Sequence, residues 1–269
     1  MRFSNKTAAE RVAIARSPNR PGAMDYIDKI FNDFIPLAGD RKCGDDPSIV
    51  AGIGFFHGKP VTVIGQRKGK SLEENMECRF GMANPEGYRK AVRIMKQAEK
   101  FNRPVITFVD TPGAYPGIEA EARGQGEAIA RSIAVMSSLR VPTVSVFIGE
   151  GGSGGALAIG VSDRTIMLEN SIFSILSPEG FASILWKDKE RWREACDVMK
   201  LTAQDLKEYG ICDQVIPEGS EGANRDDIYI YDKVDRAIKK SLDRIAKKNP
   251  EVLVKERYKK LRRIGSKKK

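Results

Sequence analysis

The sequence has little of the side-chain chemistry on which most hydrolases and many metal sites depend. Its 269 residues include one histidine, His57, and four cysteines with no C-x-x-C pair. A serine hydrolase needs a base beside its nucleophile, and a zinc site needs clustered cysteine or histidine ligands. The scattered cysteines are typical of reduced thiols, and no metal is expected in this chain; they are Cys43, Cys78, Cys196 and Cys212.

Long apolar runs and a secretion signal are also missing. No stretch approaches the roughly 18 apolar residues that identify a membrane span. The start, Met1 to Lys6, has no apolar core of the kind found in signal peptides. With 41% hydrophobic and 30% charged residues, the composition is that of an ordinary globular protein. We therefore expect a cytoplasmic protein without a membrane partner.

The net charge of +10 is concentrated at one end of the chain. Residues 255–269 hold nine basic side chains and one acidic side chain, a net +8, which leaves +2 for everything before. A basic end of this kind can bind nucleic acid or an acidic partner. A solvated terminal helix with a frayed tail is the simpler interpretation, so nucleic acid is not an expected partner.

One stretch, Gly149-Glu150-Gly151-Gly152-Ser153-Gly154-Gly155, carries most of the functional information. It has five glycines in seven positions, and it lies between a β-branched apolar run (143–148) and a small apolar segment (156–160). This pattern predicts a strand, a loop and a helix. Glycine lets a reacting group approach the main chain closely, and a helix N-terminus favours negative charge. We therefore expect backbone amides here to bind an oxyanion or a phosphate.

Three known motifs match this stretch. Residues 149–154 fit the dinucleotide-binding G-x-G-x-x-G, with Glu169 near the position of a ribose-binding acid. That motif normally stands at the start of a doubly wound fold, whereas this stretch lies past the middle of the chain. Residues 151–155 fit the nucleophile elbow of hydrolases, but no histidine follows Ser153. The third match is an oxyanion hole made of amides, with no side-chain nucleophile. The rest of the sequence favours this third interpretation.

The remaining chain predicts an alternation of strands and helices. Helices are expected over 7–15, 25–34, 85–101, 124–139, 177–186, 202–208 and 232–246, and strands over 49–56, 60–65, 105–109, 143–148, 165–168, 172–176 and 211–216. Proline and glycine keep the loop at 110–117 out of helix and sheet. In a parallel α/β sheet such loops emerge at one edge, so 110–117 and 149–155 are expected to face one pocket.

A cationic loop follows the predicted hairpin at 49–65. Gly65 to Ser71 approaches the phosphate-binding P-loop, but three residues separate its glycines where that motif needs four. No buried helix is predicted after it, so a P-loop NTPase is not favoured. Arg67, Lys68 and Lys70 are candidates for contacts with the phosphates of a ligand such as coenzyme A. A solvated turn is an equal alternative.

Several ordered blocks together resemble the carboxyltransferase α subunit of bacterial acetyl-CoA carboxylase. They are Ile106–Gly117, Gly124–Ala130, Gly149–Gly160 and Ser177–Gly180, with support from Leu37–Arg41, Phe80–Met82 and Pro85–Ala91. The resemblance implies an α/β fold of the crotonase-like (ClpP/crotonase) type, a superhelix of ββα units with peripheral helices. We divide the chain into an N-terminal helical segment (1–47), a carboxyltransferase core (48–217), a linker and C-terminal helix (218–254) and a basic tail (255–269).

The resemblance also implies a reaction and partners. In that family the α subunit and a zinc-bearing β subunit form an α2β2 heterotetramer, which works with biotin carboxylase and the biotin carboxyl carrier protein. The shared site moves a carboxyl group from carboxybiotin on the carrier to acetyl-CoA. This gives malonyl-CoA in the first committed step of fatty acid biosynthesis.

The family's site residues carry over to the two unusual loops. The backbone amides of Gly154 and Gly155 correspond to the oxyanion hole for the biotin oxygen, and Gly151 and Gly152 would shape the turn. The opposite wall of the substrate site would consist of Gly113, Ala114, Tyr115, Pro116 and Gly117.

Other classes stay open at this point. A stand-alone crotonase-fold hydratase or isomerase would need a carboxylate base, for which Glu150 and Glu179 are the candidates within the matching blocks. Another biotin-dependent acyl-CoA carboxyltransferase would share the same motifs. A protein that binds nucleic acid through 255–269 would show a steep salt dependence of binding. The lack of a side-chain acid–base pair agrees best with carboxyl transfer, because the released biotin can itself act as the base.

Overall fold

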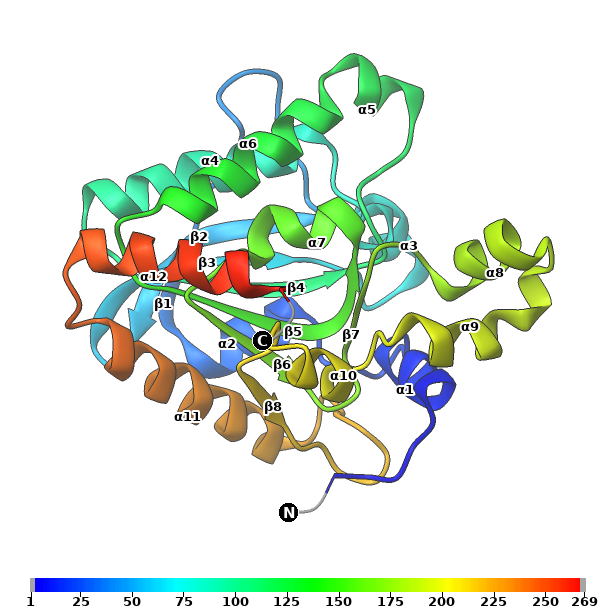
Figure 1. Ribbon diagram of the computed structural model, residues 1–269. Coiled ribbons are helices and arrows are strands. Elements are labelled where there is room, and N and C mark those ends of the chain that lie inside the picture. The colour runs from blue at the N-terminus through cyan, green and yellow to red at the C-terminus, as the bar shows by residue number, and fades with distance from the viewer. Residues whose placement is uncertain (1–2, 267–269) are drawn as a thin grey trace.

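The computed structural model describes residues 3–266 and is organised around one eight-stranded mixed sheet (Figure 1). The strand order is β1-β2-β3-β4-β5-β6-β8, and β7 pairs with β5. The first three strands are antiparallel, and the pairs from β3 onward are parallel. The strands are β1 (Asn32–Pro36), β2 (Ile49–Phe56), β3 (Lys59–Gln66), β4 (Val105–Thr111), β5 (Thr143–Gly152), β6 (Arg164–Leu168), β7 (Ile172–Ser174) and β8 (Gln214–Ile216).

Helices cover both faces of this sheet (Figure 1). On one face lie α4 (Pro85–Lys100), α6 (Gln125–Ser138) and α7 (Ser153–Gly160), and on the other lie α2 (Ala23–Ile30) and α11 (Ile228–Ile245). The remaining helices are α1 (Ala8–Ala15), α3 (Leu72–Glu77), α5 (Ile118–Ala122), α8 (Pro178–Trp186), α9 (Trp192–Met199), α10 (Ala203–Glu208) and α12 (Pro250–Arg263). None of the helices within residues 3–266 has the length and apolarity that a membrane crossing needs.

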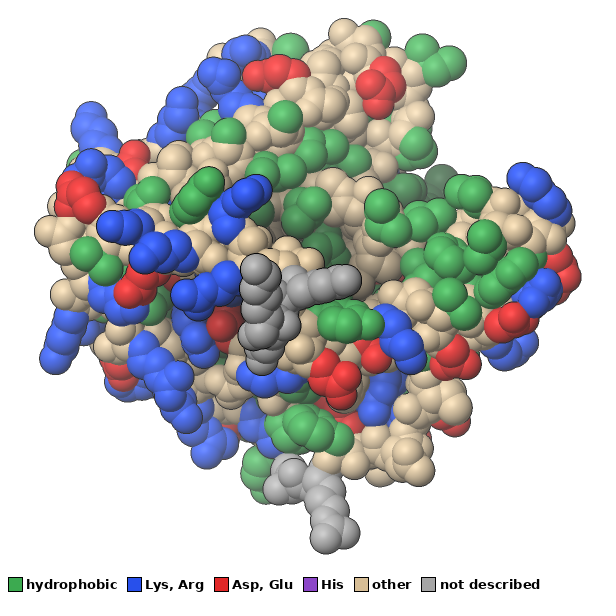
Figure 2. Space-filling model, viewed as in Figure 1, with side chains coloured by type: hydrophobic (Ala, Val, Ile, Leu, Met, Phe, Trp, Pro, Cys, Tyr) green, Lys and Arg blue, Asp and Glu red, His purple; other side chains and the backbone are tan. Residues whose placement is uncertain are grey.

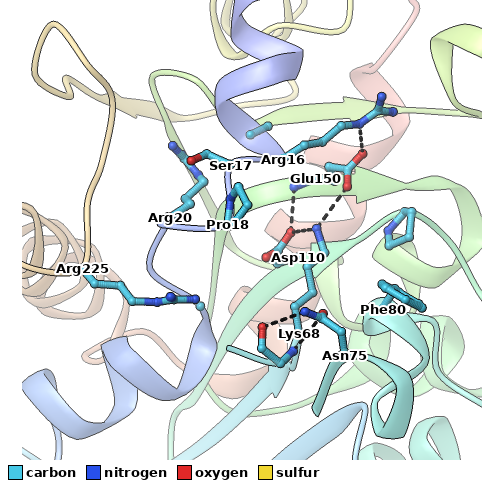
Figure 3. A pocket seen from close by; sticks show the side chains of 14 residues that line it. Arg16, Ser17, Pro18, Arg20, Lys68, Asn75, Phe80, Asp110, Glu150 and Arg225 are labelled. Atoms are coloured by element: carbon cyan, nitrogen blue, oxygen red, sulfur yellow. Dashed lines mark hydrogen bonds and ion pairs between the residues drawn. The ribbon is translucent and has the colours of Figure 1, made fainter. Parts of the chain in front are cut away.

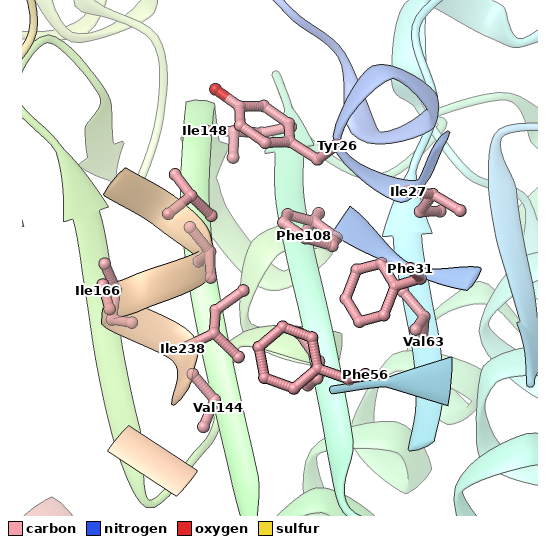
Figure 4. Close-up of a cluster of buried hydrophobic side chains, with 14 of the residues drawn as sticks. Tyr26, Ile27, Phe31, Phe56, Val63, Phe108, Val144, Ile148, Ile166 and Ile238 are labelled. Atoms are coloured by element: carbon pink, nitrogen blue, oxygen red, sulfur yellow. The ribbon is translucent and has the colours of Figure 1, made fainter. Parts of the chain in front are cut away.

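The central strand β4 explains why two hydrophobic cores form. All of its residues are buried, as expected for a parallel strand covered on both faces. Because side chains alternate along a strand, Ile106 and Phe108 pack towards α2 and α11, whereas Val105 and Val109 pack towards α4 and α6. Figure 4 shows the first of these cores, in which the Tyr26 and Phe108 rings stack with centroids 5.5 Å apart.

Helix caps follow the sequence signals at α1 and α8. Thr7 and Glu10 form a capping box at the start of α1. The Ser177 hydroxyl accepts the Gly180 N–H at the start of α8, with Pro178 at the first helical position. The helices α8 and α9 pack together as an arm that projects from the body of the molecule (Figure 1).

Most predicted elements form, but several segments differ from the prediction. The helix expected over 25–34 ends at Ile30, because residues 32–36 pair with β2 as an edge strand, so the segment 1–47 is not purely helical. Helices α3, α5 and α9 were not predicted. The glycine stretch contains no loop, because β5 continues to Gly152 through its pairing with β7, and α7 begins at Ser153.

The basic C-terminal segment is largely a packed helix. Helix α12 runs across the predicted boundary between residues 254 and 255, and Arg257 on it is 1% exposed. Its guanidinium pairs with Asp163 at 2.8 Å and donates to the Leu139 carbonyl oxygen at 2.8 Å. Figure 2 shows lysine and arginine side chains gathered around α11 and α12. The last predicted tail positions, 267–269, lie outside the described residues.

Candidate active site

The candidate site lies where β3, β4 and β5 end. Strands β4 and β5 pair in regular register from Val105 opposite Thr143 to Val109 opposite Phe147, and then Thr111 pairs with Gly151. Strand β5 therefore bulges by two residues relative to β4. The Asp110 carboxylate fills the gap, because its Oδ1 accepts the Glu150 N–H at 2.9 Å.

The 110–114 segment leaves no room for a Cβ atom at three of the five glycines. A Cβ atom at position 149 would lie 2.4 Å from Asp110 Oδ1, and one at position 152 would lie 2.0 Å from the Pro112 carbonyl oxygen. At position 155 it would lie 2.8 Å from the Ala114 nitrogen. The 112–114 segment thus packs directly on the junction between β5 and α7. The two segments that were predicted to face one pocket thus lie in contact at Gly113 and Ala114.

The N-terminus of α7 lies at this junction, and no side chain caps it. The preceding residue, Gly152, has no side chain to cap the helix, and Ser153 has a left-handed φ of +49°. The first N–H groups of any α-helix lack intrahelical acceptors and form the positive end of its dipole. Ser153 is exposed, Gly154 is half-buried and Gly155 is buried. This geometry can bind a negatively charged oxygen.

The rest of the predicted wall is fixed by other neighbours. The Tyr115 N–H donates to the Ala83 carbonyl oxygen at 3.1 Å, and its own carbonyl accepts from Gln125 Nε2 at 2.8 Å. The Arg79 guanidinium lies 5.3 Å from the centroid of the Tyr115 ring. A Cβ atom on Gly117 would meet that same ring at 2.4 Å. Tyr115 to Gly117 are therefore anchored to the 79–84 segment and to α6, rather than to Gly154.

A chain of ion pairs crosses the edge of the sheet beside the glycines (Figure 3). Lys68 Nζ lies 2.7 Å from Asp110 Oδ1 and 3.0 Å from Glu150 Oε2. Arg16 bonds Glu150 at 2.8 Å and Glu179 at 2.6 Å, which also ties α1 to the α8–α9 arm. These residues, except Glu179, line a cavity of about 260 Å³.

The same ion pairs decide whether a carboxylate base is present. Burial would raise the pKa of Glu150, but the charges and hydrogen bonds of Lys68 and Arg16 outweigh it and leave that pKa below its usual value. Arg16 likewise outweighs the effect of burial at Glu179 and lowers its pKa. Both carboxylates are therefore ionised and bonded, which makes them poor proton acceptors for a hydratase or isomerase.

Three predicted phosphate contacts border one shallow cavity of about 230 Å³. Lys68 is engaged by Asp110 and Glu150, and Lys70 pairs with Asp25 at 2.7 Å. Acidic side chains share the cavity with Arg67, Lys68 and Lys70; they are Asp25, Asp28 and Glu74. The structure thus brings the three cations together but gives two of them carboxylate partners.

Two further alternatives can be compared with the geometry. Ser153 has the strained strand-to-helix position of a nucleophile elbow, but His57 lies at the β2–β3 turn, where its Nε2 contacts Asp235 at 2.9 Å. Within residues 3–266 one group, Asp40 with Cys43 and Glu86, has metal-ligand spacing. The Asp40 carboxylate already accepts three backbone N–H groups and the Arg89 guanidinium.

Sequence reasoning missed Gln66, which links the end of β4 to α7. Its side chain is fully buried, its Nε2 donates to the Gly155 carbonyl oxygen at 2.7 Å, and its Oε1 accepts the Asp110 N–H at 3.1 Å. The available signal was a glutamine directly after an apolar strand, at the edge where the glycines were predicted. Arg16 gave no local signal, because its partners are more than 100 residues away in sequence.

Comparison with solved structures identifies the fold. The chain superposes on transcarboxylase 12S, crystallised with methylmalonyl-coenzyme A and methylmalonic acid, with a TM-score of 0.71 and 20% identity over 92% of this chain. It spans about half the length of that protein, 47%. A malonate decarboxylase hetero-tetramer from Pseudomonas matches with a TM-score of 0.66 and 16% identity, covering 80% of this chain and 86% of that one. The crotonase-type α/β fold is thereby confirmed.

Sequence comparisons identify the family. A relative from Clostridium acetobutylicum, the acetyl-coenzyme A carboxylase carboxyl transferase subunit alpha, is 55% identical over 96% of this chain and 94% of its own. One from Natranaerobius thermophilus, whose name covers subunits beta/alpha, is 56% identical over 96% of this chain and 43% of its own. The model of the family described as acetyl co-enzyme A carboxylase carboxyltransferase-like matches residues 1–265. The chain therefore belongs to the acetyl-CoA carboxylase carboxyltransferase family.

Proposed function

We propose that this chain is the α subunit of an acetyl-CoA carboxylase carboxyltransferase, and that with a β subunit it moves a carboxyl group from carboxybiotin to acetyl-CoA. The observation that carries the proposal is the uncapped N-terminus of α7, set against Gly113 and Ala114 where a Cβ atom on Gly155 would collide with backbone. Such a cradle of amides suits a developing oxyanion. Family membership selects carboxyl transfer among the reactions that use one.

The backbone N–H groups of Gly154 and Gly155 donate to the ureido oxygen of the biotin group. Carboxybiotin, when bound, supplies the carboxyl group, and negative charge develops on its ureido oxygen as that group leaves. Preorganised donors cost nothing to reorient at that moment, and losing one costs roughly 3–4 kcal/mol of barrier lowering. Gly151 and Gly152 shape the junction, and the segment from Gly113 to Gly117 forms the opposite wall.

The polar network beneath the site holds its parts in place. The Asp110 carboxylate maintains the β5 bulge, and Gln66 joins Asp110 to the first turn of α7. Lys68 bridges Asp110 and Glu150, and Arg16 is a second cation beside Glu150, so the two carboxylates are paired with two cations. Of the three cations in the 65–71 loop, Arg67 is the one that we retain as a contact for coenzyme A phosphates, because Lys68 and Lys70 already pair with carboxylates.

A β subunit completes the site in this proposal. The α8–α9 arm exposes apolar side chains, among them Ile184 and Leu185, and Figure 2 shows hydrophobic residues gathered over it. Exposed apolar patches are typical of protein interfaces. Ser177 and Pro178 at the base of the arm border a groove beside Gly151 and Gly152, so a subunit on the arm would also border the site. The wider assembly is the zinc-bearing β subunit in α2β2, with biotin carboxylase and its carrier protein.

The reverse half-reaction tests the proposal. Malonyl-CoA decarboxylation is measured with the biotin analogue biocytin, first with this chain alone and then with a β subunit from the same family. Activity in the mixture only is the expected result. Turnover by the chain alone would replace the proposal with a self-sufficient crotonase-type enzyme. If the mixture formed a stable complex but did not decarboxylate malonyl-CoA, carboxyl transfer from biotin would be overturned.

A further inference from the structure

A left-handed turn lies beside the candidate site. The φ angles of Arg79, Phe80 and Gly81 are +47°, +54° and +81°. For a residue other than glycine, this conformation costs about 1–2 kcal/mol. Two such residues in succession persist only where the surrounding structure determines them, and strain of this kind clusters at ligand sites.

The end of β4 and the loop after it hold this turn. The Thr111 hydroxyl donates to the Gly81 carbonyl oxygen at 2.7 Å. The Arg79 guanidinium stacks over the Tyr115 ring, and a Cβ atom on Gly81 would lie 3.0 Å from the Asp110 carbonyl oxygen. The turn is thus built against the end of β4 and against Tyr115, a residue of the predicted wall.

The conformation of the turn exposes an aromatic ring. Phe80 is 46% exposed, and its ring lines the cavity of about 260 Å³ together with Pro112, Lys68 and Glu150 (Figure 3). Pro112 and Glu150 also line the groove beside Gly151 and Gly152, so the cavity and the glycine junction adjoin. A strained backbone that leaves a phenyl ring in water gains nothing for the fold. It does give the cavity a flat apolar wall near Pro112, which also borders the groove at Gly151 and Gly152.

We propose that Phe80 is a substrate-binding residue, whose ring packs against the apolar ring of the biotin group while the amides of α7 hold the ureido oxygen. This inference rests on the proposed function. The cavity favours biotin over the coenzyme A end of the other substrate, because its Lys68 and Arg16 are neutralised by carboxylates. A largely uncharged ring system matches such a lining, whereas a phosphate-bearing nucleotide would find no unpaired partner in Lys68 or Arg16.

The kinetics of three variants in complex with the β subunit test this role. Phe80→Ala is expected to raise the KM for biocytin about tenfold, the scale of a lost aromatic contact, and to leave the KM for malonyl-CoA unchanged. Phe80→Tyr keeps the ring and should restore the wild-type KM. Phe101→Ala, which removes a 56% exposed ring at the end of α4, is the matched control and should change neither constant.

Phe80→Gly separates a binding role from a structural one. Glycine adopts positive φ without penalty, so the thermal midpoint of this variant should equal or exceed that of the wild type while its KM for biocytin rises. An unchanged KM for biocytin, or an equal rise for both substrates, would overturn the assignment of Phe80 to biotin with the proposed function intact. A wild-type complex without decarboxylation activity would overturn both the role of Phe80 and the proposed function.

Discussion

The two ends of the central strands differ in how they are stabilised. At the amino ends, β3, β4 and β5 pair in unbroken register, and the buried pair of Arg257 and Asp163 closes the end of the sheet. At the carboxyl ends the register shifts, and side chains such as Asp110 and Gln66 take the place of ladder hydrogen bonds. The same strands are regular at the amino ends, where only the fold is served, and β5 is irregular at the carboxyl end, where the candidate site lies.

Removing the buried cation at the amino end should have the largest effect on stability. Arg257→Met leaves Asp163 without its charge partner, so the free energy of unfolding should fall by about 3–5 kcal/mol. The kcat and KM of the folded complex should stay at wild-type values, because these residues lie at the end away from the glycines. Urea unfolding and steady-state kinetics below the midpoint measure the two effects.

The exposed Lys259 on the same helix gives the matched control for that change. Lys259→Met should alter stability by less than about 0.5 kcal/mol. Two results would contradict the claim that the amino ends of the strands serve stability and not activity. One is a stability change in Arg257→Met as small as that in Lys259→Met, and the other is a lower kcat of Arg257→Met in the folded protein.

Adding one methyl group at the carboxyl end should mainly affect activity. In Gly152→Ala the new Cβ atom would lie 2.0 Å from the Pro112 carbonyl oxygen, so the 112–114 segment must move away from α7. The kcat of the complex with a β subunit should fall by at least about 100-fold. Gly126→Ala, on α6 where no atom lies within 4 Å of the new group, is the matched control. Equal kcat values for the two variants would contradict the described geometry.

At the carboxyl end, the buried pair of Glu218 and Arg20 should make the stability of the protein depend on pH. Burial would raise the pKa of Glu218, but its pair with Arg20 and its hydrogen bonds lower it to about 2. Because the folded pKa lies below the usual glutamate pKa of about 4.5, the stabilisation is complete above pH 4.5 and is lost as the pH falls towards 2.

Glu218→Gln removes this titration. It should lower stability at pH 7 by on the order of 3 kcal/mol, and its difference from the wild type should shrink between pH 4.5 and pH 2. Urea unfolding at pH 7 and pH 3 measures this difference. If the wild type and Glu218→Gln differed equally in free energy of unfolding at the two pH values, Glu218 would not be the source of the acid dependence of stability.

The smallest effect is expected at the hairpin turn. His57 and Asp235 form an exposed contact, and pairs of this kind contribute at most about 1 kcal/mol. His57→Gln should therefore shift the thermal midpoint little and leave kcat unchanged at every pH. A loss of activity in this variant would return histidine chemistry, and with it a hydrolase mechanism, to consideration.

Local sequence signals were sufficient for much of the fold. The apolar run at 105–109 and the hairpin around His57 predicted β4, β2 and β3, and the caps at Thr7 and Ser177 placed two helix starts. Elements that depend on distant partners were not predictable in this way. Residues 32–36 become a strand only by pairing with β2. Residues 149–152 include three glycines, and they stay extended because residues 150–152 pair with β7.

The candidate site could be predicted in outline and not in its supporting contacts. Density of glycine identified the junction with α7, because no other residue allows such close backbone approach. The burial of Arg257 inside a charge run, and the pairing of Lys68 with Asp110 and Glu150, depend on partners far away in sequence. The roles given to the amides of Gly154 and Gly155 remain predictions.

The kcat of Gly154→Ala in complex with a β subunit tests the central claim most directly. The new Cβ atom would lie 3.3 Å from Ile129 Cγ2, a side chain that can shift, so the fold should tolerate the change. We predict an unchanged thermal midpoint, an unchanged KM for malonyl-CoA and a kcat reduced by about 10-fold or more, because fitting the methyl group against Ile129 moves the Gly154 amide away from the oxygen that it would hold in the transition state. A wild-type kcat would contradict the claim that these amides stabilise the developing charge.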